Sequence, residues 1–189
     1  MADDIFEDYQ KRLCNCLRSF DWSPVYKLAK DIRLAWEKER HIFLCGNGGS
    51  AANAIHIAND FLYPIAKNNG KGIKVTALTA NQAVLTCLGN DVGYENIFSF
   101  QLETLGKEGD ILIVLSGSGN SSNILNAIDT AKRKRMNTYG ILGFNGGKCL
   151  ELVDVPIHFA VNDMQISEDL QLIAGHMIMQ WLINEKFQR

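Results

Sequence analysis

Residues 41–60 have the sequence HIFLCGNGGSAANAIHIAND, in which a short apolar segment leads into a glycine-rich turn and then into a helical pattern. The same order returns at residues 110–128, DILIVLSGSGNSSNILNAI. Apolar strands that alternate with helices are typical of βαβ units, whose strands lie parallel in one sheet. The two stretches therefore predict an α/β fold with strands at residues 41–45 and 110–115.

Both turns carry groups that bind anions. Gly46–Ser50 (GNGGS) and Ser116–Ser122 (SGSGNSS) combine glycines, which let the backbone approach a ligand, with hydroxyls and with free N–H groups at the following helix start. Ligands bind at the carboxyl ends of parallel strands, so both turns are expected in one pocket. Either turn alone is better explained by a plain strand-to-helix connection. Together they predict a cradle for a small phosphorylated ligand.

The rest of the chain continues the alternation of strands and helices. Further strands are expected near residues 73–78, 137–143 and 155–159, and helices over residues 50–66, 81–90, 97–105, 121–133 and 167–186. This alternation predicts a three-layer, doubly wound, flavodoxin-like sheet of five parallel strands with helices on both faces. With no internal repeat and no linker, residues 1–189 are expected to form a single domain.

Two amphipathic helices precede the sheet, over residues 4–19 and 24–38. Ser23 is expected to cap the second helix, with Pro24 in its first turn. Because these helices lie outside the alternation and carry apolar faces, the extension of residues 1–38 is expected to pack at an interface between subunits. The alternative is that it packs wholly on its own sheet.

Composition excludes several classes of function. A net charge of −2 gives no basic surface for nucleic acid or for an anionic membrane, and no apolar stretch approaches the ~20 residues of a membrane span. The five cysteines lack zinc-finger spacing and the first residues lack a signal-peptide pattern, so a cytoplasmic protein with reduced thiols is expected. Neither turn matches the dinucleotide fingerprint or the P-loop, so no nucleotide cofactor is expected.

His56 and Asp60 stand four residues apart on the helix that follows the first glycine turn. This spacing places an imidazole and a carboxylate on one helical face, where they can share a metal ion or a proton. A histidine on a helix that also carries Ala, Ile and Phe is otherwise most often a satisfied, partly buried residue. The position beside the predicted cradle favours the functional interpretation.

Three blocks of the sequence carry a family resemblance: GNGGSAANAIHIAND, LTCLGNDVGYENIFSFQLETLGKEGDILIVLSGSGNSSNILNAI and EDLQLIAGHMI. In this order and spacing they resemble the phosphoheptose isomerases of the sugar isomerase (SIS) family. The resemblance covers nearly the whole chain. It implies a SIS fold and conversion of sedoheptulose 7-phosphate to D-glycero-D-manno-heptose 7-phosphate, which supplies heptose for bacterial lipopolysaccharide, capsule or other surface glycans. It also implies a homotetramer with zinc in active sites shared between subunits.

The resemblance also assigns roles to individual residues. It implies that both glycine turns contact the substrate, through Asn47, Gly48, Gly49, Ser50, Ser116, Gly117, Ser118 and Ser121. Asn90 and Asp91 match a further substrate-contacting pair, for which a capping or turn role is the alternative. The implied metal ligands are His56, Asp60, Glu168 and His176, of which Glu168 also contacts the substrate. Asp60 is the implied base, His176 exchanges protons with the substrate oxygens, and Glu168 is the reserve base.

The chain departs from the family pattern at two acidic positions. Asp60 stands where catalytic members have glutamate, so its side chain is one methylene shorter, and Glu168 stands where they have a glutamine that binds metal and substrate. Helix between Glu168 and His176 would span about 12 Å. Both residues can therefore bind one metal ion only if Glu168 lies in an opening turn that bends away from a straight helix. The alternative is that they serve the sites of different subunits. Two imidazoles and two carboxylates suit zinc and would accept other divalent first-row metals.

Three alternatives stay open. SIS-fold relatives include non-catalytic proteins that bind the replication initiator; they resemble the SAANA segment after the first turn but lack a carboxylate at the position of Asp60. A sugar-phosphate sensor is a second alternative. Isomerisation of a hexose or pentose phosphate is the third, because a phosphate cradle does not measure the length of the carbon chain.

Overall fold

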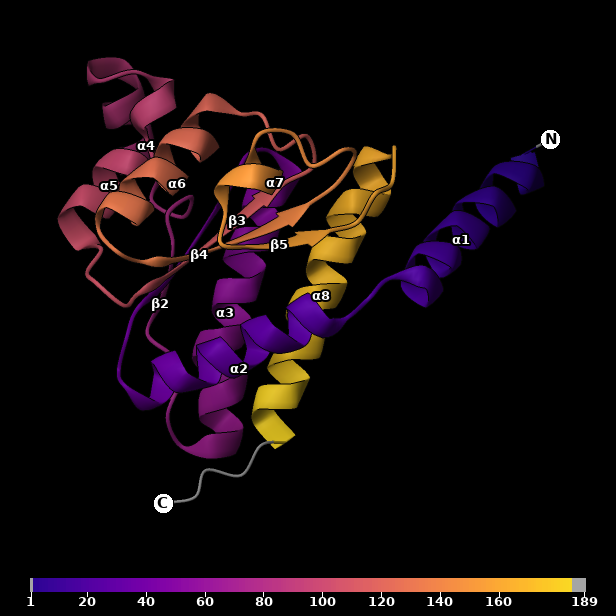
Figure 1. Ribbon diagram of the computed structural model, residues 1–189, viewed down its shortest axis with the longest axis horizontal. Helices are drawn as coiled ribbons and strands as arrows, with labels where there is room; N and C mark the ends of the chain where they lie inside the picture. The colour runs from indigo at the N-terminus through magenta and orange to yellow at the C-terminus, as the bar shows by residue number, and fades with distance from the viewer. Residues whose placement is uncertain (1, 185–189) are drawn as a thin grey trace.

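The computed structural model describes residues 2–184. Five strands form one parallel sheet in the order β2-β1-β3-β4-β5 (Figure 1). They are β1 (Ile42–Gly46), β2 (Val75–Ala77), β3 (Ile111–Ser116), β4 (Asn137–Leu142) and β5 (Val155–His158). This is the flavodoxin-like order, and it confirms the predicted doubly wound fold. The strand order reverses between β1 and β3, and at such a switch point the carboxyl ends of neighbouring strands leave a crevice.

Helices cover both faces of the sheet, because alternate strand residues point to opposite sides. Ile42 and Leu44 of β1 join one core with α2 (Ser23–Glu37), α3 (Gly49–Asn69) and α8 (Met164–Asn184). Phe43 and Cys45 of the same strand join a second core on the opposite face. Five further elements lie on that face: α4 (Gln82–Asp91), η1 (Tyr94–Asn96), α5 (Ser99–Leu105), α6 (Ser122–Arg133) and α7 (Cys149–Leu152). Every residue of β1 and β3 is buried, as expected for a sheet covered twice.

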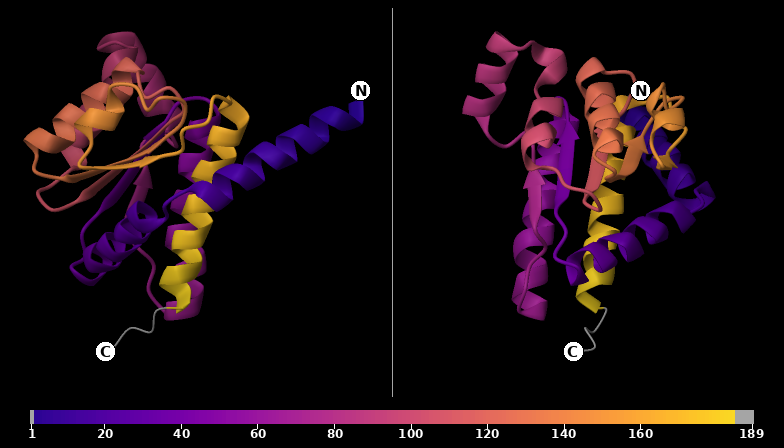
Figure 2. Two further views of the ribbon diagram at one scale, coloured as in Figure 1. Left: turned by 45° about the vertical axis from the view of Figure 1, so that its right-hand side comes forward. Right: turned by 60° about the vertical axis from the view of Figure 1, so that its left-hand side comes forward.

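Helix α1 (Ala2–Ser19) extends away from the body of the molecule at its N-terminal end (Figures 1 and 2). Further along the helix, the Tyr9 hydroxyl donates to Asp169 of α8 at 2.5 Å, and Arg12 pairs with Asp163 at 2.5 Å. Burial and the Asp169 carboxylate raise the pKa of Tyr9 to about 12, so this hydroxyl remains a donor at neutral pH. These contacts tie α1 to the start of α8.

Two helix starts differ from the prediction. Ser23 lies inside the first turn of α2, not at its cap, and Asp21 accepts hydrogen bonds from the N–H and the hydroxyl of Ser23 at 3.0 and 2.7 Å. Helix α8 begins at Met164, before the predicted start, because Asp163 accepts a hydrogen bond from the Ile166 N–H at 3.0 Å. The predicted C-terminal end of α8 lies outside the described residues.

Smaller differences concern the lengths of elements. Helix α3 continues past its predicted end, and Gly70 terminates it in the left-handed conformation at φ 78°. Strand β2 is shorter than predicted, and η1 and α7 were not predicted.

Within residues 2–184, no helix combines the length and the apolarity that crossing a membrane requires.

Candidate active site

The two glycine turns line one cavity of about 280 Å³ at the carboxyl ends of β1 and β3, which we call the cradle. Its lining consists of both turns and the start of α8: Asn47, Gly48, Gly49, Ser50, Leu115, Ser116, Gly117, Ser118, Ser121, Met164 and Glu168. The turn residues that the family resemblance assigned to the substrate therefore face the same space. Helices α3 and α6 both begin here, so their N-terminal N–H groups and dipoles favour an anion.

The start of α8 lies close against the glycines of both turns. A Cβ atom on Gly49 would overlap the carboxylate of Glu168, and one on Gly117 would overlap the thioether of Met164, so these flexible side chains would have to move. Gly48 has a φ of 56°, a conformation that side chains rarely allow, so glycine is favoured there by the backbone. Side chains of α8 thus close the cradle from the side.

A pair of amides joins the two turns. The side chains of Asn47 and Asn123 donate to each other at 2.9 and 2.8 Å, and Asn123 is buried. The hydroxyl of Tyr94 donates to the same Asn47 oxygen at 3.0 Å. Because each amide satisfies the other, the turn after β1 is fixed relative to the first turn of α6. Asn123 was not predicted from the sequence, where a polar residue on a buried helical face is the only local signal.

The second turn presents serine hydroxyls to the cradle. Ser116 accepts a hydrogen bond from the Gly119 N–H at 3.0 Å, and Ser118 accepts one from the Asn120 N–H at 3.4 Å. Ser121 precedes α6, but its side chain makes no capping hydrogen bond to that helix. None of these contacts uses the hydroxyl proton, so all three serines can donate to a ligand.

Behind the first turn, a buried chain of hydrogen bonds connects α3 to α8. Asn53 donates through Nδ2 to the main-chain oxygen of Glu168 and to Oε1 of Gln171, both at 3.0 Å. Gln171 donates in turn through Nε2 to Ser50 Oγ at 3.0 Å. Asn53 and Gln171 are both buried, and neither was predicted from the sequence to belong to the site. The chain of bonds links the wall of the cradle to the helix that closes it.

Three side chains converge further along α3 and α8. His56 Nε2 lies 3.4 Å from Asp60 Oδ2, His176 Nε2 lies 3.5 Å from the same oxygen, and the two imidazole nitrogens are 2.9 Å apart. Asp60 is mostly buried, with 12% of its side chain exposed, whereas the imidazoles are 49% and 41% exposed. The structure thus brings His56 and Asp60 together as their spacing predicted, and His176 joins them from α8. Two imidazoles and a carboxylate are a donor set that can hold a divalent metal.

The structure does not bring the other predicted residues into this group. Glu168 lies on the wall of the cradle, a helical rise of about 12 Å from His176. Asn90 and Asp91 lie at the exposed C-terminal end of α4, where the Asn90 amide donates to Asp91 at 2.8 Å. Neither of these two residues lines the cradle of its own chain.

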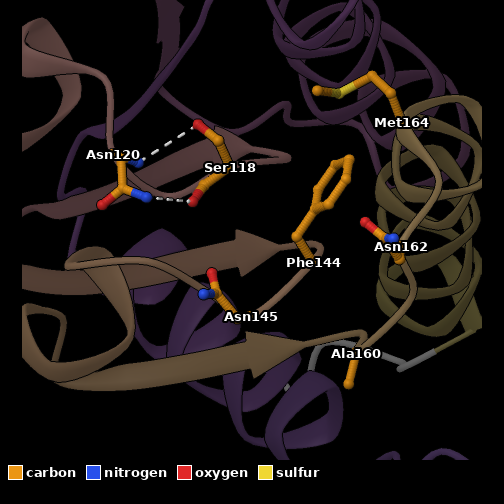
Figure 3. Close-up of a pocket in the computed structure, with 7 residues that line it drawn as sticks. All are labelled: Ser118, Asn120, Phe144, Asn145, Ala160, Asn162 and Met164. Atoms are coloured by element: carbon orange, nitrogen blue, oxygen red, sulfur yellow. Dashed lines mark hydrogen bonds between the residues drawn. The ribbon is translucent and has the colours of Figure 1, made fainter.

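A second cavity of about 480 Å³, the annex, adjoins the cradle and shares Ser118 and Met164 with it. Figure 3 shows the side chains around it, which include three amides and one aromatic ring from Asn120, Asn145, Asn162 and Phe144, together with Ala160. Its lining carries no charged side chain. The annex therefore suits neutral, hydroxylated groups of a ligand better than a second phosphate.

The chain resembles known proteins in sequence. The family model for the SIS domain matches residues 6–143. A phosphoheptose isomerase of Clostridium acetobutylicum is 40% identical over 153 residues, which cover 81% of this chain and 78% of the relative. A phosphoheptose isomerase of Synechocystis sp. is 35% identical over 181 residues, which cover 94% of this chain and 93% of the relative.

Solved structures have the same fold. A phosphoheptose isomerase from Neisseria gonorrhoeae superposes with a TM-score of 0.88 at 26% identity, covering 96% of this chain and 98% of that one. A phosphoheptose isomerase from Francisella tularensis superposes with a TM-score of 0.91 at 23% identity, covering 98% of this chain and 100% of that one. Since the family model matches most of the chain and a relative that is 35% identical matches 94% of it, this protein belongs to the SIS-domain family.

Proposed function

We propose that this chain is an aldose–ketose isomerase that interconverts sedoheptulose 7-phosphate and D-glycero-D-manno-heptose 7-phosphate, a step in supplying heptose for bacterial surface glycans. The observation that carries the proposal is the placement of an anion-binding cradle and a His–Asp–His group on the same pair of helices, α3 and α8. Relatives named phosphoheptose isomerase, at 40%, 35% and 43% identity, support the same activity.

The separation of the two parts suits a seven-carbon chain. From Ser50 to His56 helix α3 rises about 9 Å. Six C–C bonds of about 1.5 Å in an extended zigzag reach about 7.5 Å, and the phosphate ester adds to this length. With its phosphate in the cradle, an extended heptulose phosphate places C1 and C2 near Asp60 and His176. A pentose phosphate is two bonds shorter, about 2.5 Å less, and does not span the gap as well.

Asp60 is the proposed base. From ketose to aldose, its carboxylate removes a proton from C1, the electron pair forms the C1=C2 bond of an enediol, and His176 gives a proton to O2. Asp60 then returns the proton to C2 while His176 accepts one from O1, which leaves the carbonyl at C1. Glu168, the reserve base, lies on the cradle wall, nearer to the proposed phosphate than to the reacting carbons.

Zinc is the proposed metal for the His–Asp–His group. The two Nε2 atoms and the carboxylate of Asp60 lie close enough together to share one divalent ion, and three protein ligands leave a position for the substrate. A metal held there would polarise the substrate oxygens. Because a metal-bound atom cannot also move a proton, the transfers assigned to His176 and Asp60 would then use the other ring nitrogen, Nδ1, and the second carboxylate oxygen. Glu168 is left out of the proposed ligand set, because it lies about two helical turns away from His176.

We also propose a homotetramer in which the extension of residues 1–38 packs between subunits. Near the N-terminus of α1, Ile5 and Phe6 are 70% and 77% exposed. A largely apolar groove between α2 and α8, lined in part by Tyr26 and Trp181, is open on the surface. Apolar surfaces of this kind usually mark contacts with another protein. A second copy of the chain is the proposed partner.

Shared active sites give Asn90 and Asp91 a proposed role. Both side chains are exposed at the end of α4 and lie outside the cradle of their own chain. In an assembly with shared sites, they would contact the sugar bound by a neighbouring subunit.

All five cysteines are free thiols, which supports the cytoplasm as the proposed location.

Conversion of sedoheptulose 7-phosphate by the purified protein tests the proposed activity. The reaction is followed by NMR of the sugar protons, with added zinc and after chelation, and beside Asp60→Asn as a control of matched shape. We expect an aldose product whose formation requires Asp60. A protein that binds the sugar phosphate but forms no product would contradict the proposal and favour a sensor or an initiator-binding role. Equal turnover of a pentulose 5-phosphate would overturn the substrate assignment.

A further inference from the structure

The hydrogen bonds behind the first glycine turn have a fixed direction. A main-chain oxygen only accepts, so the Asn53 group that lies 3.0 Å from the Glu168 oxygen is its NH₂. The same nitrogen carries a second proton, so the Gln171 atom that faces it at 3.0 Å is the accepting Oε1. The other branch of Gln171 is then its NH₂, which donates to Ser50 Oγ at 3.0 Å. One main-chain carbonyl therefore orients two amides and makes the Ser50 oxygen an acceptor.

Because the hydrogen bonds run in this direction, the hydroxyl proton of Ser50 remains available to a ligand in the cradle. Within residues 2–184, the Gln171 amide is the only hydrogen-bond partner of Ser50 Oγ. Because Gln171 donates to one lone pair of this oxygen, the hydroxyl hydrogen points away from Gln171. Ser50 is one of the residues that line the cradle, so a hydroxyl proton that points away from Gln171 would be available to a ligand there. That is the polarity that a phosphate oxygen requires.

We propose that Asn53 and Gln171 are positioning residues that hold the Ser50 hydroxyl as a donor to the phosphate of the sugar substrate. The inference rests on the proposed function, because it takes the ligand of the cradle to be a phosphate. Neither amide touches the substrate, and both act through Ser50. Their burial, at 8% and 1% exposed, keeps water from exchanging these bonds and reversing the direction.

Two substitutions of Gln171 separate this role from packing alone. Gln171→Met removes the donor and supplies no strong acceptor, so the Ser50 hydroxyl still donates to a phosphate. Gln171→Glu keeps the shape and the bond from Asn53 but offers an acceptor to Ser50, which turns the hydroxyl proton away from the cradle. Each change is also made in a protein that carries Ser50→Ala and therefore has no hydroxyl proton at this position. Comparing the two Gln171 variants in that protein measures the direct effect of the added charge on binding.

The probe is the heptitol 7-phosphate obtained by reducing the carbonyl of sedoheptulose 7-phosphate, which binds without being isomerised. Its affinity for the full chain is measured by titration calorimetry, with the unphosphorylated heptitol as a control. Thermal unfolding shows that each variant is folded. We expect Gln171→Glu to bind more weakly than Gln171→Met, and the ratio of their affinities to be at least ~10-fold larger with the Ser50 hydroxyl than when Ser50 is alanine.

Three results would contradict either the role of Asn53 and Gln171 or the proposed phosphate cradle, and the results show which of the two has failed. An equal penalty for Gln171→Glu with and without the Ser50 hydroxyl would mean that the added charge acts on the phosphate directly, and the inference would fall. Unchanged affinity in Ser50→Ala alone would also overturn it. If the unaltered protein binds the heptitol phosphate no better than the heptitol, the proposed phosphate cradle itself fails, and the inference fails with it.

Discussion

At the scale of single residues, Glu168 is the side chain that fits the cradle least well. Its carboxylate lies against Gly49 in a cavity whose helix termini and hydroxyls favour an anion. Two like charges about 4 Å apart repel by about 1 kcal/mol even in water and by more near a protein surface. The glutamine that the family resemblance predicts at this position would carry no such charge. Glu168 would therefore weaken the binding of the phosphate that we propose for the cradle.

Replacing Glu168 by glutamine is expected to tighten the binding of sedoheptulose 7-phosphate by roughly 5-fold, because the shape is kept and about 1 kcal/mol of repulsion is removed. Calorimetry with the reduced heptitol 7-phosphate gives the affinity. Glu151→Gln makes the same change at an exposed position on α7 and is the matched control. Weaker binding by Glu168→Gln would show instead that the carboxylate accepts a hydrogen bond from the sugar.

Substitutions of Asp60 test the proposed base. Asp60→Asn is expected to lower kcat at least ~100-fold, since general-base catalysis typically contributes that much, while sugar phosphate affinity stays within ~3-fold. Asp60→Glu restores the longer carboxylate of the family pattern and is expected to retain activity. Steady-state kinetics beside calorimetry separate the two effects. Normal turnover by Asp60→Asn would remove Asp60 from its assigned role.

At the scale of secondary-structure elements, the start of α8 depends on Asp163. Arg12 donates to its carboxylate, as does the Ile166 N–H, and together they hold the pKa of Asp163 below its ordinary value. A carboxyl with a lower pKa in the folded than in the unfolded protein stabilises the fold above its unfolded pKa. That stabilisation is lost as the pH falls through the folded pKa.

Asp163→Ala is therefore expected to lower the free energy of unfolding by about 1 kcal/mol at neutral pH, the usual worth of a helix cap. The difference from the unaltered protein should shrink as the pH falls below about 4, where the carboxyl becomes protonated. Urea unfolding at a series of pH values measures this difference in the free energy of unfolding. A deficit of constant size across that range would argue against the pairing of Asp163 with Arg12.

The amide pair between Asn47 and Asn123 couples β1 to α6, and so couples the two halves of the cradle. Asn123→Ala leaves the Asn47 amide short of a partner and is expected to cost about 1–3 kcal/mol of stability and to raise KM. Asp129→Ala, at an exposed position of the same helix, is the control. Unchanged KM in a fully folded Asn123→Ala protein would show that the pair does not shape the cradle.

At the scale of the whole molecule, the elements that sequence patterns predicted best are those with local causes. The five strands and both glycine turns follow from hydrophobic spacing and turn chemistry over a few residues. Asn123 and Gln171 were not predicted, because their partners lie 76 and 121 residues away. The predicted cap at Ser23 was wrong because Asp21 occupies its hydroxyl and its N–H. The separation of Glu168 from His176, by contrast, is the rise along one continuous helix, which the spacing of the two residues in the sequence already indicated.

The exposed end of α1 carries the prediction about assembly. Replacing both Ile5 and Phe6 by aspartate is expected to reduce the mass of the particle in solution, because charged side chains would no longer be covered by a second copy. Light scattering coupled to gel filtration measures the mass. Gln10→Asp changes an exposed polar residue of the same helix and is the control. An unchanged mass for the double variant would exclude this end of α1 from the interface.

Helix α8 contributes Glu168, Gln171 and His176, and it follows every other element of the site along the chain. A ribosome makes both glycine turns well before it makes this helix. Until α8 docks, Ser50 has no amide to orient it, and Phe61 of α3 lacks part of its cover. A nascent chain therefore has the complete proposed site only after α8 has emerged and docked, and full-strength binding of sugar phosphate during translation would mark that moment.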